Sequence, residues 1–216
     1  MKGYVLAIIT QFRRSRLRMH ITFSFTSQEF SYVRLPSANL HLFQSMLYSL
    51  LPDELASRLH DEGFDSEGRR MKLFAMGWPV SSSRPQFGEG TVVFPLPMKL
   101  TVSTPVNELA SAFAAGAMSR EDIRIGNNHL ICSGIEKQAQ KINSEAVTVR
   151  TLSPITCYEA SERNGRQYTE YFAYDDERFV KGIHFNLLRK FRLLYPEKDI
   201  PEDSFSITPA GRQIGR

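Results

Sequence analysis

Strand-like and helix-like patterns alternate along residues 19–135 in an order that few folds accommodate. Apolar side chains at every second position over 19–25 predict a strand, and apolar side chains at helical spacing over 42–50 predict a helix. Pro52 begins a second short helix that extends to about Asp61. The other elements expected are strands at 71–78, at 91–104 and at 123–125 with 129–135, and an amphipathic helix at 106–118. The resulting order, β-α-β-β-α-β, is that of a ferredoxin-like domain, in which two helices cover one face of a four-stranded antiparallel sheet.

A second group of patterns begins near Glu145 and repeats part of this order. The elements expected there are strands at 147–157 and 168–174, a turn at Asn164-Gly165, a long helix at about 176–194 and a strand that starts at 205–207. This β-β-α-β order leaves a strand edge and an apolar helix face without partners, which is costly. We therefore expect the natural protein to continue past Arg216.

The predicted fold class is α+β, with two tandem ferredoxin-like domains. Residues 1–17 precede the patterned part and are expected to form an amino-terminal extension. Residues 18–142 are expected to form the first domain. Residues 143–216 are expected to form the second domain, which is incomplete at its carboxyl end.

Composition and charge restrict the compartment and the kind of partner. The chain carries 27 Lys and Arg residues against 23 Asp and Glu residues, and the net charge of +4 suits a polyanionic partner. Cys132 and Cys157 form no Cys-x-x-Cys pair, and the histidines lack metal-ligand spacing, so we expect no metal and no cofactor. The apolar run Tyr4–Ile9 is too short for a signal peptide or a membrane helix. The sequence therefore indicates a cytoplasmic protein without a membrane partner.

Three stretches, Gln44–Tyr48, Leu59–Glu62 and Met71–Phe74, follow one another at a distinctive spacing. A helix ends in a Leu-Tyr pair, a histidine follows about a dozen residues later, and a Lys-Leu-Phe strand comes soon after. A fourth stretch, Leu152–Ile155, opens the second domain. In these stretches the chain resembles the CRISPR-associated endoribonucleases that cut precursor guide RNA within its repeats, which belong to the RAMP superfamily.

The resemblance implies a catalytic set of Tyr48, His60 and Lys72 and a reaction that requires no metal ion. In this reaction a 2′-hydroxyl of the RNA attacks the adjacent phosphate and leaves a 2′,3′-cyclic phosphate and a 5′-hydroxyl. Such cleavage needs a base, an acid and positive charge near the phosphorane oxygens. His60 is the residue expected to transfer a proton, because histidine titrates near neutral pH. Lys72 is expected to stabilise the phosphorane and Tyr48 to position the RNA or stabilise charge, and which of Tyr48 and His60 is base and which is acid is left open.

Four arginines are the candidates for RNA binding. Arg69 and Arg70 precede Lys72, while Arg189 and Arg192 lie three residues apart on the long helix, where a solvated helix face is the alternative interpretation. The implied partners are CRISPR precursor RNA, processed guide RNA and an effector complex, and the oligomeric state is left open. The family also carries a glycine-rich loop near its carboxyl end, for which this sequence offers only Gly211 and Gly215.

Three other functions are compatible with the sequence. The first is a catalytically inactive RAMP-type protein that binds guide RNA in an effector complex. The second is a metal phosphohydrolase, whose site would combine His60 and Asp61 with the acidic residues Glu62, Asp65 and Glu67. The third is a ferredoxin-like module that binds a small ligand and no nucleic acid, because a fold does not determine a function.

Overall fold

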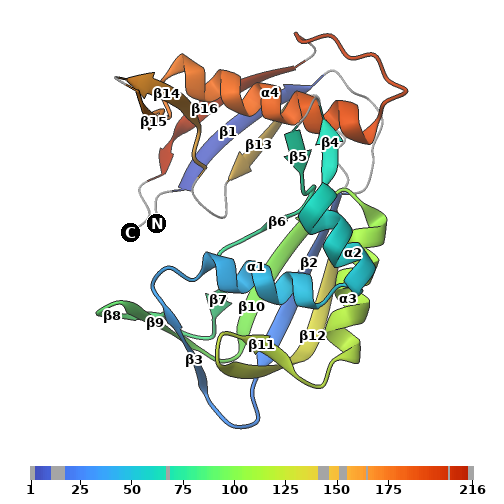
Figure 1. The fold of residues 1–216 in the computed structure, drawn as a ribbon, viewed down its shortest axis with the longest axis vertical. Coiled ribbons are helices and arrows are strands. Elements are labelled where there is room, and N and C mark those ends of the chain that lie inside the picture. Colours follow the sequence, from blue (N-terminus) through green and yellow to red (C-terminus); the bar gives the residue numbers. More distant parts are fainter. Residues whose placement is uncertain are drawn as a thin grey trace. The chain divides into compact units, whose positions relative to one another are not determined.

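The computed structural model describes residues 3–10, 18–66, 69–140, 146–150, 155–163, 165–203 and 205–213. The chain divides into two compact units (Figure 1). The central unit contains Leu17–Phe64 and Lys72–Lys141, and the terminal unit contains Met1–Arg16, Asp65–Met71 and Ile142–Arg216. Within the described residues, no helix is long and apolar enough to cross a membrane.

The central unit has the predicted ferredoxin-like topology. Its sheet has the strand order β11-β12-β2-β10-β6, and neighbouring strands are antiparallel. Without the added edge strand β11, the order corresponds to strands 4-1-3-2 of a β-α-β-β-α-β chain, so the prediction is confirmed. The strands are β2 (Arg18–Thr26), β6 (Ala75–Met76), β10 (Met98–Thr104), β11 (Ile123–Ile125) and β12 (Asn128–Gln140), and the short β7 (Val80–Ser81) also pairs with β10.

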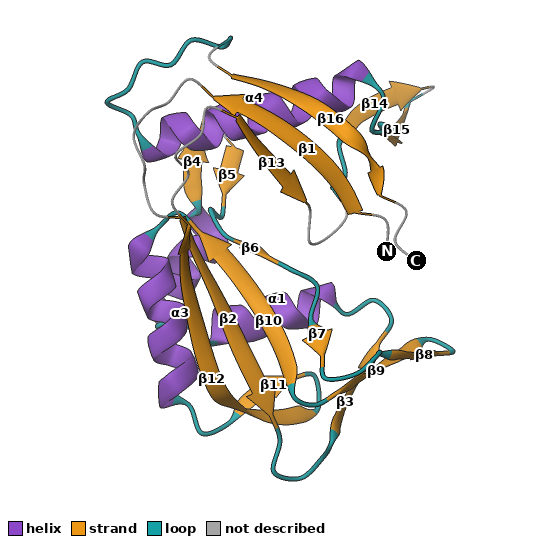
Figure 2. Cartoon of the chain, turned by 180° about the vertical axis from the view of Figure 1, so that it is seen from behind, coloured by secondary structure: helices purple, strands orange, loops and turns teal. Residues whose placement is uncertain are grey.

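Two helices, α1 (Leu40–Ser49) and α3 (Asn107–Ser119), cover one face of this sheet (Figure 2). The alternation along β2 turns every second side chain toward them, which buries Ile21, Phe23 and Phe25. The helices bury the stripe of apolar residues that their spacing predicts, namely Phe43, Met46 and Leu47 on α1 and Leu109, Ala110, Phe113 and Ala117 on α3. Each large side chain buried in this way contributes roughly 1.5–3 kcal/mol.

The remaining elements of the central unit were predicted less well. A three-stranded sheet β3-β9-β8 is formed by β3 (Tyr32–Pro36), β8 (Gln86–Gly88) and β9 (Thr91–Pro95). The strand expected at 91–104 is therefore two strands, β9 and β10, which belong to different sheets and are separated by Leu96 and Pro97. The helix expected from Pro52 to Asp61 is the short α2 (Asp53–Ser57) followed by one π-helical turn, η1 (Arg58–Glu62).

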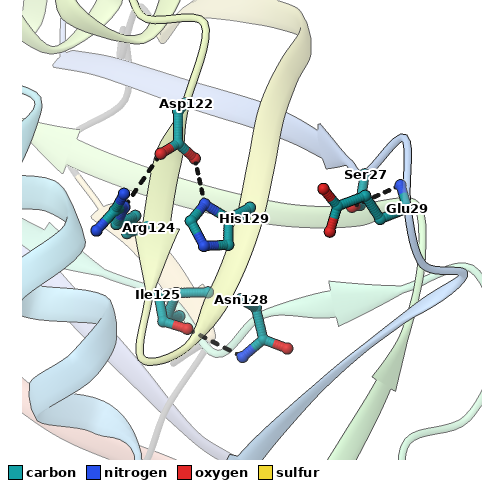
Figure 3. Close-up of polar contacts among 7 residues, drawn as sticks. All are labelled: Ser27, Glu29, Asp122, Arg124, Ile125, Asn128 and His129. Atoms are coloured by element: carbon teal, nitrogen blue, oxygen red, sulfur yellow. Dashed lines mark hydrogen bonds and ion pairs between the residues drawn. The ribbon is translucent and has the colours of Figure 1, made fainter.

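A network of polar contacts fixes the β11–β12 hairpin (Figure 3). The carboxylate of Asp122 accepts a bond from Arg124 Nε at 3.1 Å and lies 2.9 Å from His129 Nδ1. These contacts lower the pKa of Asp122, with the Arg124 bond as the larger cause. Asn128 also donates to the carbonyl oxygens of Ile125 and Arg34, at 3.0 and 3.1 Å, and so ties the hairpin to β3.

The terminal unit contains a three-stranded antiparallel sheet in the order β13-β1-β16. Its helix α4 (Glu177–Leu194) buries Phe179, Ile183 and Leu188, and the first two of these pack in a core cluster with Ile207 of β16. The other strands form two separate hairpins, β14 with β15 and β4 with β5. The strand bounds are β1 (Gly3–Thr10), β4 (Phe64–Ser66), β5 (Arg69–Met71), β13 (Ala146–Arg150), β14 (Tyr158–Arg163), β15 (Arg166–Tyr171) and β16 (Phe205–Gln213).

The expectation that residues 1–17 form an extension is wrong for β1. This strand is the middle strand of the terminal sheet, where Ile8 lies opposite Val147 on one side and Ile207 on the other. The strand that starts at Phe205 therefore pairs with β1 and is not left without a partner. The residues 152–154 of the fourth resembling stretch, together with Gly68 and Gly215, lie outside the described residues, whereas Gly211 lies within β16.

The helices α1 and α3 meet where only a glycine fits. A Cβ atom at Gly116 of α3 would lie 1.7 Å from the carbonyl oxygen of Leu50, the residue that follows α1. This close approach fixes the carboxyl end of α1 against α3.

We expect Gly116→Ala to lower the free energy of unfolding by about 1–3 kcal/mol, the usual cost of forcing extra atoms into a packed interior. The measurement is urea unfolding followed by circular dichroism. Gly134→Ala is the matched control, because no atom lies within 4 Å of a Cβ placed there. Equal stability of Gly116→Ala and the wild type would show that the two helices do not meet at this glycine.

Candidate active site

The three residues of the predicted catalytic set lie together in the central unit. Tyr48 occupies the last turn of α1, His60 lies in η1, and Lys72 lies between β5 and β6. The rings of Tyr48 and His60 are 6.0 Å apart between centroids, with an interplanar angle of 76°. The Lys72 Nζ lies 5.0 Å from the centroid of the Tyr48 ring. An imidazole and an ammonium from two other segments therefore lie close to the phenol ring of Tyr48.

The local structure around His60 follows from the residues on either side. Leu55 and Leu59 are buried, which holds α2 and η1 against the core and leaves His60 exposed. The N–H of Gly63 donates to the Arg58 carbonyl oxygen at 2.8 Å, and Gly63 has a φ of +61°, a conformation that glycine adopts without steric cost. This bond closes the wide turn that carries His60, and π-helical turns are frequent at functional sites.

A carboxylate lies within hydrogen-bond distance of one ring nitrogen of His60. Its Nδ1 lies 2.8 Å from the Oδ1 of Asp61, the next residue in the chain. A carboxylate accepts from the N–H at Nδ1, so this contact leaves Nε2 available to a ligand. The sequence placed Asp61 only in the alternative metal site and gave no signal of this contact.

The hydroxyl group of Tyr48 has no hydrogen-bond partner in the part of the chain that the structure describes. Its oxygen is buried. One edge of the ring packs against Phe74, at a centroid distance of 5.9 Å, so the core holds the ring in place. Leaving a buried polar group unpaired costs about 1–3 kcal/mol. An unpaired group of this kind is unusual and calls for an explanation, such as a ligand that completes it.

A hollow of about 240 Å³ lies at this position and is lined by Tyr48, Ala56, Ser57, His60 and Asp61. It is smaller than a typical small-molecule pocket of roughly 300–1,000 Å³. A larger hollow of about 440 Å³ lies between the β2–β3 loop and Pro97, but among the residues that line it only Glu29 is ionisable. The smaller hollow is therefore the one lined by residues able to transfer a proton or donate a hydrogen bond, namely His60 and Tyr48, and its size suits a short segment of a long ligand.

The four candidate RNA-binding arginines belong to the terminal unit. Arg70 is exposed on β5, next to Arg69. Arg189 and Arg192 on α4 are half-buried, and Arg192 donates to the Ile200 carbonyl oxygen at 3.3 Å. Burial also lowers the pKa of Lys190 between them. This part of α4 is therefore packed against its own unit more closely than a solvated helix face.

The alternative metal site has less support from the geometry. Within the described residues, no group of three or more His, Cys, Asp and Glu side chains is arranged to hold a metal ion. Glu67, one of the acidic residues considered for that site, lies outside the described residues.

Comparison with solved structures supports the same fold. The chain superimposes on a structure described as "CRISPR associated protein Cas6" with a TM-score of 0.60 and 16% identity, covering 84% of this chain and 73% of that one. A protein of a Cas6-related gene from Pyrococcus furiosus gives 0.63 and 15%, with coverages of 86% and 73%. A structure described as an RAMP protein binding different RNA substrates gives 0.61 and 13%, with coverages of 87% and 75%. At these identities the likeness establishes the fold alone.

Sequence comparison finds similar proteins of the same kind. A CRISPR-associated endoribonuclease, Cas6 2 of Methanocaldococcus jannaschii, is 25% identical over 191 residues, which cover 86% of this chain and 68% of that protein. Residues 136–216 match the family model for the C-terminal part of CRISPR-associated protein Cas6. Together these comparisons support a CRISPR-associated protein of the Cas6/RAMP kind. The comparisons thus agree with the resemblance found in the sequence, and the region that matches the family model includes α4 and β16.

We expect Tyr48→Phe to raise the free energy of unfolding by about 1 kcal/mol, because it removes a buried hydroxyl that has no partner and keeps the ring that packs on Phe74. Thermal unfolding followed by circular dichroism measures the change. Tyr32→Phe is the control, since Tyr32 is exposed and its change is expected to stay within roughly 0.5 kcal/mol. A loss of stability in Tyr48→Phe would mean that the hydroxyl already has a favourable partner.

Proposed function

We propose that this chain is an endoribonuclease that cuts CRISPR precursor RNA within its repeats without a metal ion. The observation that carries the proposal is the position of the Tyr48 ring, which lies 6.0 Å from the His60 ring and 5.0 Å from the Lys72 Nζ, beside a hollow that Tyr48 and His60 line. The Tyr48 hydroxyl is buried and has no partner among the described residues. The name of the 25% identical relative, an endoribonuclease, supports the same activity.

His60 transfers the proton in this proposal. The Asp61 carboxylate on Nδ1 sets the imidazole so that Nε2 faces the RNA. In its neutral form Nε2 accepts the proton of the 2′-hydroxyl, and in its protonated form it donates to the departing 5′-oxygen. Either role leads to the same products, a 2′,3′-cyclic phosphate and a 5′-hydroxyl.

Lys72 and Tyr48 act on the phosphate. The ammonium supplies positive charge to the phosphorane oxygens, and the face of the Tyr48 ring attracts that ammonium and limits its movement. The Tyr48 hydroxyl donates to a phosphate or ribose oxygen, which satisfies a group that is unpaired in the free protein. Tyr48 thus positions the reacting groups.

The terminal unit contributes RNA binding in this proposal. Arg69, Arg70, Arg189 and Arg192 contact phosphates of precursor RNA and of the processed guide RNA, and the release of counterions makes this binding sensitive to salt. Phosphate contacts position the RNA and carry no sequence information by themselves. Handing the processed guide RNA to an effector complex in the cytoplasm completes the proposed role.

We expect His60→Ala to slow cleavage of a labelled repeat RNA in EDTA by a factor of about 10²–10⁴, the usual contribution of a positioned acid or base. Binding of the RNA, measured by fluorescence anisotropy, stays nearly unchanged. The control is His129→Ala, since His129 lies on the β11–β12 hairpin, pairs with Asp122 and is not among the residues that line the hollow. Mass spectrometry of the products identifies the cyclic phosphate.

Other outcomes of the same experiment point to the other functions. Salt-sensitive binding by the wild type without cleavage would identify an inactive RNA-binding protein of the same family. Cleavage that appears only after a divalent cation is added would indicate metal-dependent hydrolysis. RNA binding that salt does not weaken, or no binding, would favour the small-ligand module.

We expect Lys72→Met to lower the rate of the cleavage step about 10²-fold, because removing one group that stabilises transition-state charge has an effect of this order. Lys72→Arg keeps the charge and is expected to retain more activity than Lys72→Met. Single-turnover kinetics with saturating enzyme separate this step from RNA binding. Equal rates for Lys72→Met and wild type would remove Lys72 from the catalytic set.

A further inference from the structure

The residue after Lys72 has an unusual backbone conformation. Leu73 has a φ of +48°, and among the described residues no other non-glycine residue has a positive φ. A bulky side chain rarely adopts this conformation because its Cβ crowds the following carbonyl oxygen. Leu73 is buried, with 5% of its surface exposed, so it remains in this conformation only because the surroundings hold it there.

Thr104, at the end of β10, makes the contact that holds the turn. Its Oγ1 donates to the Leu73 carbonyl oxygen at 2.8 Å and accepts from the Val106 N–H at 3.1 Å. Thr104 has 3% of its surface exposed and is one of two buried polar residues among those described. Because the Oγ1 accepts from Val106, its single proton is directed at Leu73.

The pairing of β6 with β10 explains why a side chain is used here. Met76 lies opposite Val102 and Ala75 lies opposite Ser103, so Phe74 would be the next residue to pair, with Thr104. The pairing stops before that point. The hydroxyl of Thr104 instead donates to the carbonyl oxygen of Leu73, the residue before Phe74. At this residue the chain is no longer paired with β10 and leads back to Lys72.

The turn connects two contacts on a single ring. Phe74, on one side of Leu73, packs against Tyr48 and against Phe113 of α3, at centroid distances of 5.9 and 5.5 Å. Lys72, on the other side of Leu73, places its ammonium over the same Tyr48 ring. The conformation of Leu73 therefore determines where the ammonium lies relative to the phenol.

We propose that Thr104 is a positioning residue of the cleavage site, which acts by holding the Leu73 carbonyl and so fixing Lys72 against Tyr48. The proposal rests on the proposed function, because it concerns the residue assigned there to the phosphorane. Thr104 itself touches no reacting atom and is buried, so its effect reaches the RNA only through Lys72.

The kinetic test is a double-mutant cycle. Thr104→Val removes the hydroxyl and is expected to lower the single-turnover rate about tenfold while the affinity for repeat RNA stays within about twofold of the wild type. Thr104→Ser keeps the hydroxyl and is expected to restore the rate. In a Lys72→Met background, Thr104→Val is expected to cause no further loss, since the residue that it positions is absent. The same tenfold loss in both backgrounds would show a general structural effect and overturn the proposal.

A second measurement is independent of cleavage. Because the Lys72 Nζ lies 5.0 Å from the centroid of the Tyr48 ring, we expect this ring to shift the NMR signals of the Lys72 side-chain methylenes upfield in protein labelled with ¹³C-lysine. Tyr48→Leu is expected to remove the shift and so to identify it. We expect the shift to persist in Thr104→Ser and to collapse in Thr104→Val. If Thr104→Val does not fold, Thr104→Cys, whose thiol is a weaker donor, is expected to reduce the shift. An unchanged shift in the variant that folds would overturn the proposal.

The two measurements separate this proposal from the proposed function. If the wild type cleaves no repeat RNA but the methylene shift depends on the Thr104 hydroxyl, the proposed activity fails and the positioning of Lys72 stands. If the wild type cleaves repeat RNA but the methylene shift is the same with and without the Thr104 hydroxyl, the proposed activity stands and the positioning role fails.

Discussion

The central unit depends on one interaction, the packing of α1 and α3 on the apolar face of β2. Ile21, Phe23 and Phe25 alternate along this strand and are buried, and α1 and α3 bury their apolar stripes over the same face of the sheet. Burying these side chains sets the axis of α1 relative to the sheet. Gly116 then allows α3 to touch the carbonyl of Leu50 just after α1, which limits how far that end of the helix can shift. The core thus determines the position of Tyr48, the residue on which the candidate site is centred.

The candidate site combines rigid and open features. The Tyr48 ring packs against Phe74, which itself packs against Phe113 in the core. Because these contacts restrict the ring, it is a suitable platform for an ammonium and an imidazole. His60 and Asp61, in contrast, are exposed on a turn whose last residue is glycine. The aromatic platform is therefore fixed before a ligand arrives, while the proton-transferring group faces solvent. The Tyr48 hydroxyl is buried without a partner among the described residues, an arrangement expected to lower stability, and this is the pattern expected where function opposes stability.

The sequence predicted the elements that have a strong local period and missed those that depend on distant partners. The alternation over 19–25 and the helical spacing of 42–50 and 106–118 gave the right elements, and their order gave the right topology. The same periods gave no indication of the short β3, and β1 was assigned to an extension because its partners lie about 140 and 200 residues away. The turn at Leu73 was also missed, since leucine has no preference for a positive φ and only the bond from Thr104 accounts for it.

In the candidate site, too, the sequence predicted local features and missed those that depend on distant partners. The sequence patterns predicted the helices that carry Tyr48 and His60, and the idea that these residues meet Lys72 came from the resemblance to a family. Their proximity depends on the wide turn η1 and on the departure of the chain from β6 at Leu73, and neither feature has a local signature that a single sequence reveals. The contact of Asp61 with the His60 ring and the bond from Thr104 were missed for a similar reason, because an aspartate next to a histidine and a threonine before a proline are common in loops of any protein.

The middle position of β1 in the terminal sheet has a consequence for how the protein is made. A ribosome that adds roughly 5–20 residues per second needs on the order of 10–40 s to pass from β1 to β16. During this interval the central unit, whose segments are all synthesised earlier than β16, can fold, whereas β1 has at most one of its two neighbours. A strand with an open edge is prone to pair with other chains. Nascent chains of this protein thus depend on late closure of that sheet, and slow translation or a stall before residue 205 would prolong their exposure to aggregation.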